Sequence, residues 1–170
     1  MNMKLPEDFS PEERAERAMS LFRQGYNCCQ SVTLAFSDIL SPDVSPELLA
    51  VIGSGFGGGM ARMREVCGAF SGTVVMAGFI SPASDPSVKE SRRDNYALVQ
   101  RFAEEFKGRN GGSIVCRELL GLSSPGKEDP TPSERTPEYY RKRPCVQIIG
   151  NAARLVAEYL LGENSPLSPK

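Results

Sequence analysis

A glycine-rich stretch, residues 53–78, constrains the fold more than any other part of this 170-residue sequence. Its first seven positions hold Gly53, Gly55, Gly57, Gly58 and Gly59. Glycine permits backbone conformations and close approaches that other residues resist. A run of small and apolar residues follows and predicts a buried helix, on which Gly68 and Gly72 share one face and allow a neighbouring helix to come close. Two interpretations remain open: a tightly packed crossing of loop and helix, or a site that the loop and Cys67 line.

Capping residues and apolar spacing predict an all-α fold. Helix starts are indicated at Ser10, Asn27, Ser45 and Ser113. Apolar residues recur at helical spacing, and no segment shows the alternation of a half-buried strand. The predicted helices span residues 10–24, 28–40, 45–52, 64–79, 88–107, 113–121 and 145–161, with an irregular turn at 138–143 and Pro144 at the first position of the last helix. We therefore expect a single-domain bundle of about six or seven helices around a buried Gly/Ala-rich central helix.

The same pattern divides the chain into a core and two less ordered parts. The single helical domain spans 1–170, with a core at about 10–161. Residues 122–137 carry four prolines and little to bury, which predicts a flexible surface loop. Residues 162–170 predict a frayed tail.

Composition limits the possible partners and chemistries. The net charge of −1 gives no reason to expect nucleic-acid binding, and the longest apolar run is too short and glycine-rich for membrane insertion. The N-terminal residues lack the apolar core of a secretion signal, so we expect a cytoplasmic protein whose thiols stay reduced. Histidine is absent, which removes Ser-His-Asp and Cys-His catalysis and every zinc site that contains histidine.

Four of the five cysteines fall at predicted helix starts: Cys28, Cys67, Cys116 and Cys145. Unpaired N–H groups and the helix dipole stabilise an anion there, so we expect lowered thiol pKa values in a chain without histidine. The alternative is that each is a small buried hydrophobic residue. Cys29 adjoins Cys28 and would point about 100° away on a helix, so we interpret it as a packing residue.

Spacing does not by itself show that the four cysteines meet. Zinc fingers and thioredoxin-like proteins bring cysteines in close pairs, whereas these lie tens of residues apart on four elements. A shared site would form only in the assembled bundle.

The order and surroundings of these cysteines resemble the redox-active family called C_GCAxxG_C_C. The matching segments are Tyr26-Asn27-Cys28, Gly55-Phe56-Gly57-Gly58-Gly59, Cys67-Gly68-Ala69 with Gly72, Cys116-Arg117-Glu118-Leu119-Leu120-Gly121, and Cys145. The resemblance covers roughly residues 15–161. Cys29 stands where such proteins would have a small residue. A similar domain accompanies the haem domain of split-Soret cytochromes, where an iron–sulfur centre is associated with it; this chain has no C-x-x-C-H motif.

The resemblance implies that the family's four cysteines correspond to Cys28, Cys67, Cys116 and Cys145. They are the candidate redox residues and the candidate metal ligands, and Gly57, Gly58, Gly59 and Gly68 are the candidate cofactor-binding residues. The leading hypothesis is electron transfer through a [2Fe–2S] cluster, since cysteine thiolates in fours are its usual ligands. The alternatives are thiol–disulfide exchange without a cofactor, and a non-catalytic module that binds zinc or a small molecule. The redox partner is unknown, and a homodimer is compatible with the sequence.

Three arginines flank the cysteines in the sequence: Arg62, Arg64 and Arg117. They could favour thiolates electrostatically, but isolated charges near a motif are common. We therefore expect solvated surface side chains at these positions.

Overall fold

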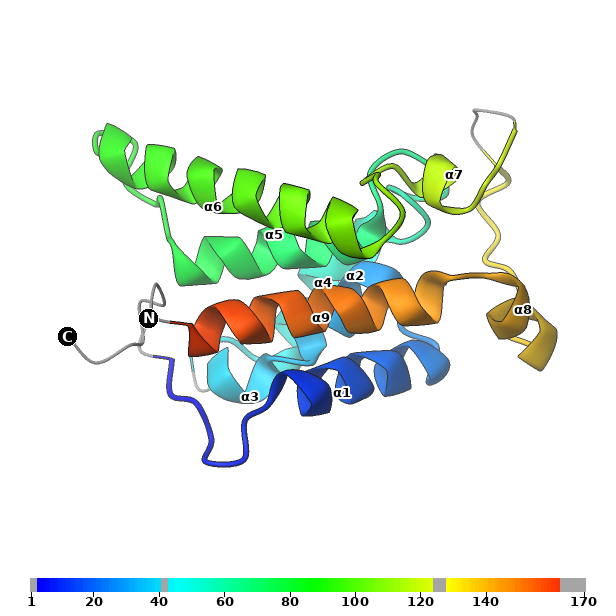
Figure 1. Ribbon diagram of the computed structural model, residues 1–170, viewed down its shortest axis with the longest axis horizontal. Helices are drawn as coiled ribbons and strands as arrows, with labels where there is room; N and C mark the ends of the chain where they lie inside the picture. The colour runs from blue at the N-terminus through cyan, green and yellow to red at the C-terminus, as the bar shows by residue number, and fades with distance from the viewer. Residues whose placement is uncertain (1–2, 41–42, 124–127, 163–170) are drawn as a thin grey trace.

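The computed structural model describes residues 3–40, 43–123 and 128–162 (Figure 1). This part of the chain is all-α, as predicted. Its elements are α1 (Pro11–Arg23), α2 (Cys28–Leu34), α3 (Ser37–Leu40), α4 (Pro46–Gly53), the 3₁₀ turn η1 (Ser54–Phe56), α5 (Gly68–Ile80), α6 (Lys89–Arg109), α7 (Cys116–Leu119), α8 (Pro137–Lys142) and α9 (Cys145–Leu161). The predicted frayed tail lies outside the described residues except for Gly162.

Local capping explains where the first helices begin. The Ser10 hydroxyl accepts a hydrogen bond from the Glu13 N–H at 3.1 Å. Asn27 and Gln30 form a reciprocal capping box at the start of α2, and Ser45 accepts from the Leu48 N–H at 3.1 Å. Each cap satisfies an N–H that lacks a partner within its helix, so the sequence alone was sufficient to place these three starts.

Other helix boundaries differ from the prediction. The segment 28–40 forms two helices, α2 and α3, and the helix expected from Arg64 begins only at Gly68, because Arg64 has a positive φ of 60°. Ser113 does not cap α7; its hydroxyl accepts from the Val115 N–H, and Val115 is the N-cap. Pro144 is the N-cap of α9 rather than its first residue.

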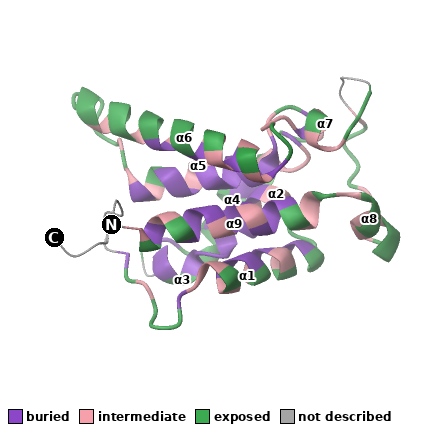
Figure 2. Cartoon of the chain, viewed as in Figure 1, coloured by how far each residue is buried: buried purple, intermediate pink, exposed green. Residues whose placement is uncertain are grey.

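The core is built around two helices, α5 and α9. The predicted central helix α5 contacts α2, α6 and α9, while α9 contacts α1, α2, α5 and α6. Figure 2 shows both helices buried over much of their length, with the outer face of α6 exposed. A Cβ placed on Gly72 would lie 2.7 Å from the Val32 Cβ and 3.1 Å from the Cys29 carbonyl oxygen, so α2 and α5 cross closely there, as predicted.

A buried charge fixes α1 against α3. Arg14 donates to both carboxylate oxygens of Asp38, at 2.5 and 2.7 Å, and to the Ala35 carbonyl oxygen at 2.6 Å. Burial raises the pKa of Asp38, but the hydrogen bonds and charge of Arg14 outweigh it and hold that pKa below its ordinary value. The ion pair therefore persists at neutral pH, where it compensates the burial of Arg14.

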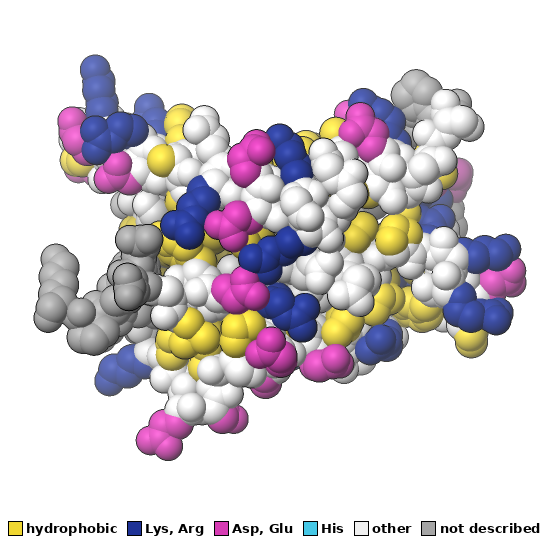
Figure 3. All heavy atoms as spheres, viewed as in Figure 1, with side chains coloured by type: hydrophobic (Ala, Val, Ile, Leu, Met, Phe, Trp, Pro, Cys, Tyr) yellow, Lys and Arg dark blue, Asp and Glu magenta, His cyan; other side chains and the backbone are white. Residues whose placement is uncertain are grey.

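The outer surface carries both signs of charge. Figure 3 shows Lys and Arg side chains interspersed with Asp and Glu on the face in view. Several of these groups pair directly, for example Arg109 with Glu158 at 2.6 Å. Among the helices of the described residues, none combines the length and apolarity that crossing a bilayer requires.

Candidate functional site

The glycine loop between η1 and α5 winds in the left-handed sense. Positive φ angles run without interruption from Gly58 to Arg62, at 65°, 70°, 61°, 50° and 65°, and recur at Arg64. Hydrogen bonds close this turn, from the Ala61 N–H to the Gly55 carbonyl at 2.9 Å and from the Glu65 N–H to the Gly59 carbonyl at 3.0 Å. Non-glycine residues adopt this conformation at an energetic cost, so the surrounding packing must impose it.

A short antiparallel pairing joins this loop to the start of α7. Val66 bridges Val115, the Cys67 N–H donates to the Ile114 carbonyl at 2.8 Å, and the Cys116 N–H donates to the Glu65 carbonyl at 2.6 Å. Side chains alternate across such a pairing, so Cys67 and Cys116 project from the same face of it. Two cysteines far apart in the sequence are thereby placed together.

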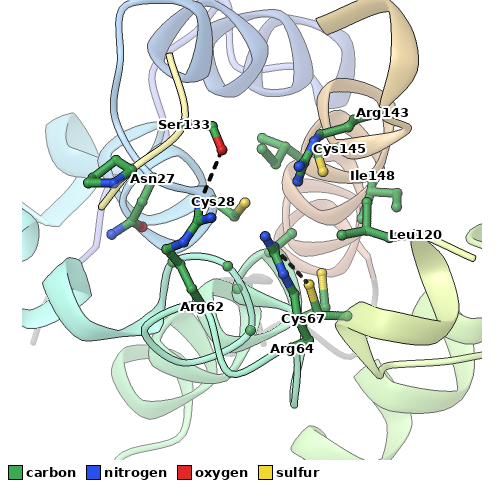
Figure 4. A pocket seen from close by; sticks show the side chains of 18 of the residues that line it. Asn27, Cys28, Arg62, Arg64, Cys67, Leu120, Ser133, Arg143, Cys145 and Ile148 are labelled. Carbon is green, nitrogen blue, oxygen red and sulfur yellow. Dashed lines mark hydrogen bonds between the residues drawn. The ribbon is translucent and has the colours of Figure 1, made fainter. Parts of the chain in front are cut away.

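All four candidate cysteines line one cavity of about 340 Å³. Cys67 is the N-cap of α5, and Cys28, Cys116 and Cys145 are the first residues of α2, α7 and α9. The cavity lies at the end of the bundle where α7, α8 and the start of α9 meet (Figure 1). Figure 4 shows the sulfurs of Cys28, Cys67 and Cys145 facing a common space. The structure therefore brings together the four cysteines that the sequence singled out.

The candidate glycines form the wall of the same cavity: Gly57, Gly58, Gly59 and Gly68. A Cβ on Gly59 would lie 2.6 Å from the Cys116 Cβ, and one on Gly68 would lie 3.0 Å from the Cys28 Cβ. Glycine at these two positions thus allows the cysteines to approach the loop. The neighbours found around these two glycines are protein atoms. Cofactor binding by the four candidate glycines therefore stays a prediction.

Their mutual interaction distinguishes Cys28 and Cys145 from the other two cysteines. The neighbouring Cys145, together with burial, raises the pKa of Cys28 well above its ordinary value. The neighbouring Cys28 lowers the pKa of Cys145, so that a thiolate at Cys145 is favoured beside a protonated Cys28. Arg143, two residues before Cys145, acts in the same direction through its charge. Cys145 is therefore the thiol that ionises first.

The expectation of lowered pKa values at all four helix starts was wrong for three of them. Burial raises the pKa of Cys67 to about 12, although the Ala69 and Phe70 N–H groups at the start of α5 act the other way. Burial also raises the pKa of Cys116, despite the hydrogen bond that Arg64 donates to its sulfur at 3.9 Å. Desolvation of a thiolate in these positions outweighs the stabilisation by helix N–H groups.

The sequence analysis expected Arg62 and Arg64 to be solvated surface residues, and this expectation was wrong. Arg64 is only 3% exposed and donates to both carboxylate oxygens of Glu128, at 2.8 and 2.6 Å. Arg62 donates to Glu128 at 2.7 Å and to the Asp129 carbonyl oxygen at 2.7 Å. Arg117 is partly exposed and pairs with Glu65 at 2.8 Å. The glycine loop and the segment after residue 127 are thus held together by charge.

That segment closes one side of the cavity. The side chains of Pro130, Pro132, Ser133 and Arg135 line it, and Ser133 accepts a hydrogen bond from Arg62 at 3.3 Å (Figure 4). Sequence reasoning missed these residues because the segment has no helical spacing and no motif. The proximity of Arg143 to Cys145 in the sequence was the one available signal for a further cationic wall residue.

Cys29 lies apart from the cavity, in contact with the core. It is 0% exposed, and burial followed by the charge of Cys28 raises its pKa to about 12. The structure supports its interpretation as a packing residue.

The raised pKa of Cys29 predicts a loss of stability at high pH. The unfolded chain releases this proton above about pH 8.5, whereas the folded chain retains it, so the contribution of the thiol is complete below that pH and is lost as pH rises. We expect Cys29→Ala to reduce the fall in unfolding free energy between about pH 8 and about pH 10 by about 2 kcal/mol. Urea denaturation at both pH values measures this; equal slopes for the two proteins would contradict it.

The four sulfurs do not form a ready-made metal site. Within residues 3–40, 43–123 and 128–162, no three His, Cys, Asp or Glu side chains are grouped closely enough to hold an ion. The donor set suits an iron–sulfur cluster in kind and number, but its spacing does not. Binding a cluster would require the thiol side chains to move together.

Among the comparisons with known proteins, the match is to a family. The family model described as "Putative redox-active protein (C_GCAxxG_C_C)" matches residues 26–159. No curated protein and no solved structure shows significant similarity to the chain. The family match extends from the residues just before Cys28 to the last turns of α9, and so includes every wall of the cavity. The chain belongs to the C_GCAxxG_C_C family.

Proposed function

We propose that this protein carries out thiol–disulfide exchange through Cys28 and Cys145. The observation that carries the proposal is that both thiols line one cavity and shift each other's pKa in opposite directions. A pair with one thiol of lowered pKa and one protonated neighbour has the arrangement of an attacking and a resolving cysteine. Reducing surroundings such as the cytoplasm would keep the pair in its dithiol form.

The exchange is written in two steps. The Cys145 thiolate attacks one sulfur of a substrate disulfide, the substrate S–S bond breaks, and the departing thiolate takes up a proton. Cys28 then loses its proton, attacks the Cys145 sulfur and releases the second half of the substrate, which is also protonated. Two protein thiols become one disulfide, and the substrate disulfide becomes two thiols, so protons and electrons balance.

Alkylation of the reduced protein tests the roles of the two cysteines. Because alkylation requires the thiolate, we expect iodoacetamide to label Cys145 first at neutral pH, with Cys67 and Cys116 labelled later. Replacing Cys28 with alanine removes the neighbour that lowers the pKa of Cys145, so that pKa should rise and labelling of Cys145 at neutral pH should slow. Mass spectrometry of tryptic peptides over a pH series measures both effects. Preferential labelling of Cys67 or Cys116 would contradict the assignment.

A cluster-binding function is the second candidate, favoured by the placement of all four cysteines on one cavity. Cys28, Cys67, Cys116 and Cys145 would hold an iron–sulfur cluster, which supplies one-electron transfer when bound. Guanidinium groups beside the thiols would stabilise its negative charge. Protein purified without oxygen should then contain iron and sulfide and absorb visible light. Zinc without sulfide would indicate a metal-binding module instead, and metal-free protein with a Cys28–Cys145 disulfide after oxidation supports exchange.

A further inference from the structure

The cavity that holds the thiols is strongly cationic. Four arginines line it, Arg62, Arg64, Arg135 and Arg143, whereas none of the described Asp or Glu side chains does. The nearest carboxylate, Glu128, lies behind the wall and binds Arg62 and Arg64. Most of the guanidinium charge facing the cavity therefore has no compensating carboxylate. A concave site of one sign concentrates ligands of the other sign.

Arg135 and Arg143 are the two cations of this wall without a direct carboxylate partner, although the charge of Arg143 also lowers the pKa of Glu128. Neither forms an ion pair within the described residues, and Nη1 of Arg135 is buried without a hydrogen-bond partner there. A buried donor without a partner is costly, which a ligand that accepts a hydrogen bond would relieve. Arg135 and Arg143 are thus the groups in this wall best suited to receive an anion.

Aromatic rings hold both side chains in position. The Arg135 guanidinium lies 4.3 Å from the centre of the Phe22 ring and 4.9 Å from that of Tyr139, and Arg143 lies 4.8 Å from the Tyr139 ring centre. Stacking on an aromatic ring restricts the motion of a guanidinium. Its N–H groups lie in the plane of the guanidinium and can still donate hydrogen bonds. Carboxylate and phosphate oxygens match that planar set of donors.

Much of the rest of the wall is apolar and lies beside the thiols. Ala69, Leu120, Ile148 and Ile149 supply hydrocarbon surface. Figure 4 shows Arg143 beside Cys145 and Ile148 on the same side of the cavity. A wall of this kind suits an organic molecule with an anionic group rather than a small inorganic anion.

We propose that the substrate is a low-molecular-weight organic disulfide bearing carboxylate or phosphate groups, bound by Arg135 and Arg143 while Cys145 attacks its S–S bond. The inference rests on the thiol–disulfide exchange proposed above and assigns its substrate class. The bonds formed and broken in this substrate are those of the two exchange steps given above.

Exchange with two chromogenic disulfides of opposite character tests the substrate class. Reduced protein is mixed in a stopped-flow instrument with dithiobis(nitrobenzoate), a dianion, and with dithiodipyridine, which is neutral. For Arg135→Gln we expect the second-order rate constant with the dianion to fall about tenfold or more, because a fixed cation is lost. The rate constant with the neutral disulfide should fall several-fold less than that with the dianion, since there only the effect of the Arg135 charge on the thiols is lost. High salt should reduce the reaction of the dianion more than that of the neutral disulfide.

Arg154→Gln is the matched control. Arg154 carries the same charge, but it lies on α9 outside the cavity wall and pairs with Glu12 at 3.7 Å. It should leave both rate constants unchanged. Equal losses with the two disulfides in Arg135→Gln, or the same change in Arg154→Gln, would overturn the proposal.

An unreactive ligand separates this inference from the exchange chemistry. Thiodipropionate carries two carboxylates but only a thioether, so it binds without reacting. Calorimetric titration should show binding to the wild type that weakens about tenfold in Arg135→Gln. Binding without any disulfide exchange would refute the proposed function and keep the anion site, whereas exchange with no dianion preference and no binding would refute the anion site alone.

Discussion

Cys145→Ser is expected to lower the rate constant for exchange with a disulfide by roughly a hundredfold or more, because a serine hydroxyl does not replace a thiolate as the nucleophile. The effect should be the largest of any single cysteine substitution, since Cys145 alone among the cavity thiols has a lowered pKa. The measurement is the stopped-flow rate with a chromogenic disulfide, made on protein reduced and kept without oxygen.

Two further variants determine what that loss means. In Cys28→Ser, Cys145 should still attack the substrate disulfide, but the mixed disulfide should accumulate because Cys28 is no longer there to resolve it. Intact-mass measurement detects the added half of the substrate. Cys29→Ala, a change of a buried cysteine outside the cavity, should retain the wild-type rate. Full activity in Cys145→Ser, or a mixed disulfide at Cys67 or Cys116 in the wild type, would show that another thiol attacks.

Gly72→Leu is expected to destabilise the fold by about 3 kcal/mol or more, through overpacking. A Cβ on Gly72 already lies within 2.7 Å of the Val32 Cβ, and the Cys29 carbonyl 3.1 Å away belongs to the helix backbone. Neither atom is the end of a flexible side chain, so α2 and α5 would have to separate. Because Cys28 begins α2, the cavity would deform as well.

Gly78→Leu on the same helix is the matched control. Gly78 is exposed, and nothing lies within 4 Å of a Cβ built on it. Leucine is a better helix former than glycine, so this variant should be neutral or more stable by up to about 1 kcal/mol. Urea denaturation of both variants gives the comparison. A Gly72→Leu protein as stable as Gly78→Leu would contradict the close crossing.

The helical fold could be predicted where local interactions determine it. Asn27 and Ser45 cap their helices with atoms three residues away, and such signals are present in the sequence. The start of α5 could not be placed in this way. Arg64 was the first residue of the predicted helix, but its side chain binds Glu128 and its carbonyl oxygen accepts from the Arg117 N–H of α7. Long-range contacts override local preference there.

Part of the candidate site could likewise be predicted from the sequence, and part could not. The sequence singled out Cys28 and Cys145 by their positions at helix starts, and the structure places both on the cavity. Their difference in pKa was not predictable, since it depends on how the two thiols interact in the folded chain. Arg135 had no signal at all, because its role depends on stacking against Phe22 from a different part of the chain.

The left-handed turn at residues 58–62 also bears on how the protein comes apart on heating. Met60, Ala61 and Arg62 each have a positive φ, a conformation that costs roughly 1–2 kcal/mol for each residue other than glycine. Such a turn persists only while its neighbours enforce it, and the ion pairs of Arg62 and Arg64 with Glu128 are among the contacts that do so. Local opening therefore favours release of this segment ahead of the helices. We expect the cavity to open on this side while the helices persist, so helix content measured by circular dichroism would not report that step.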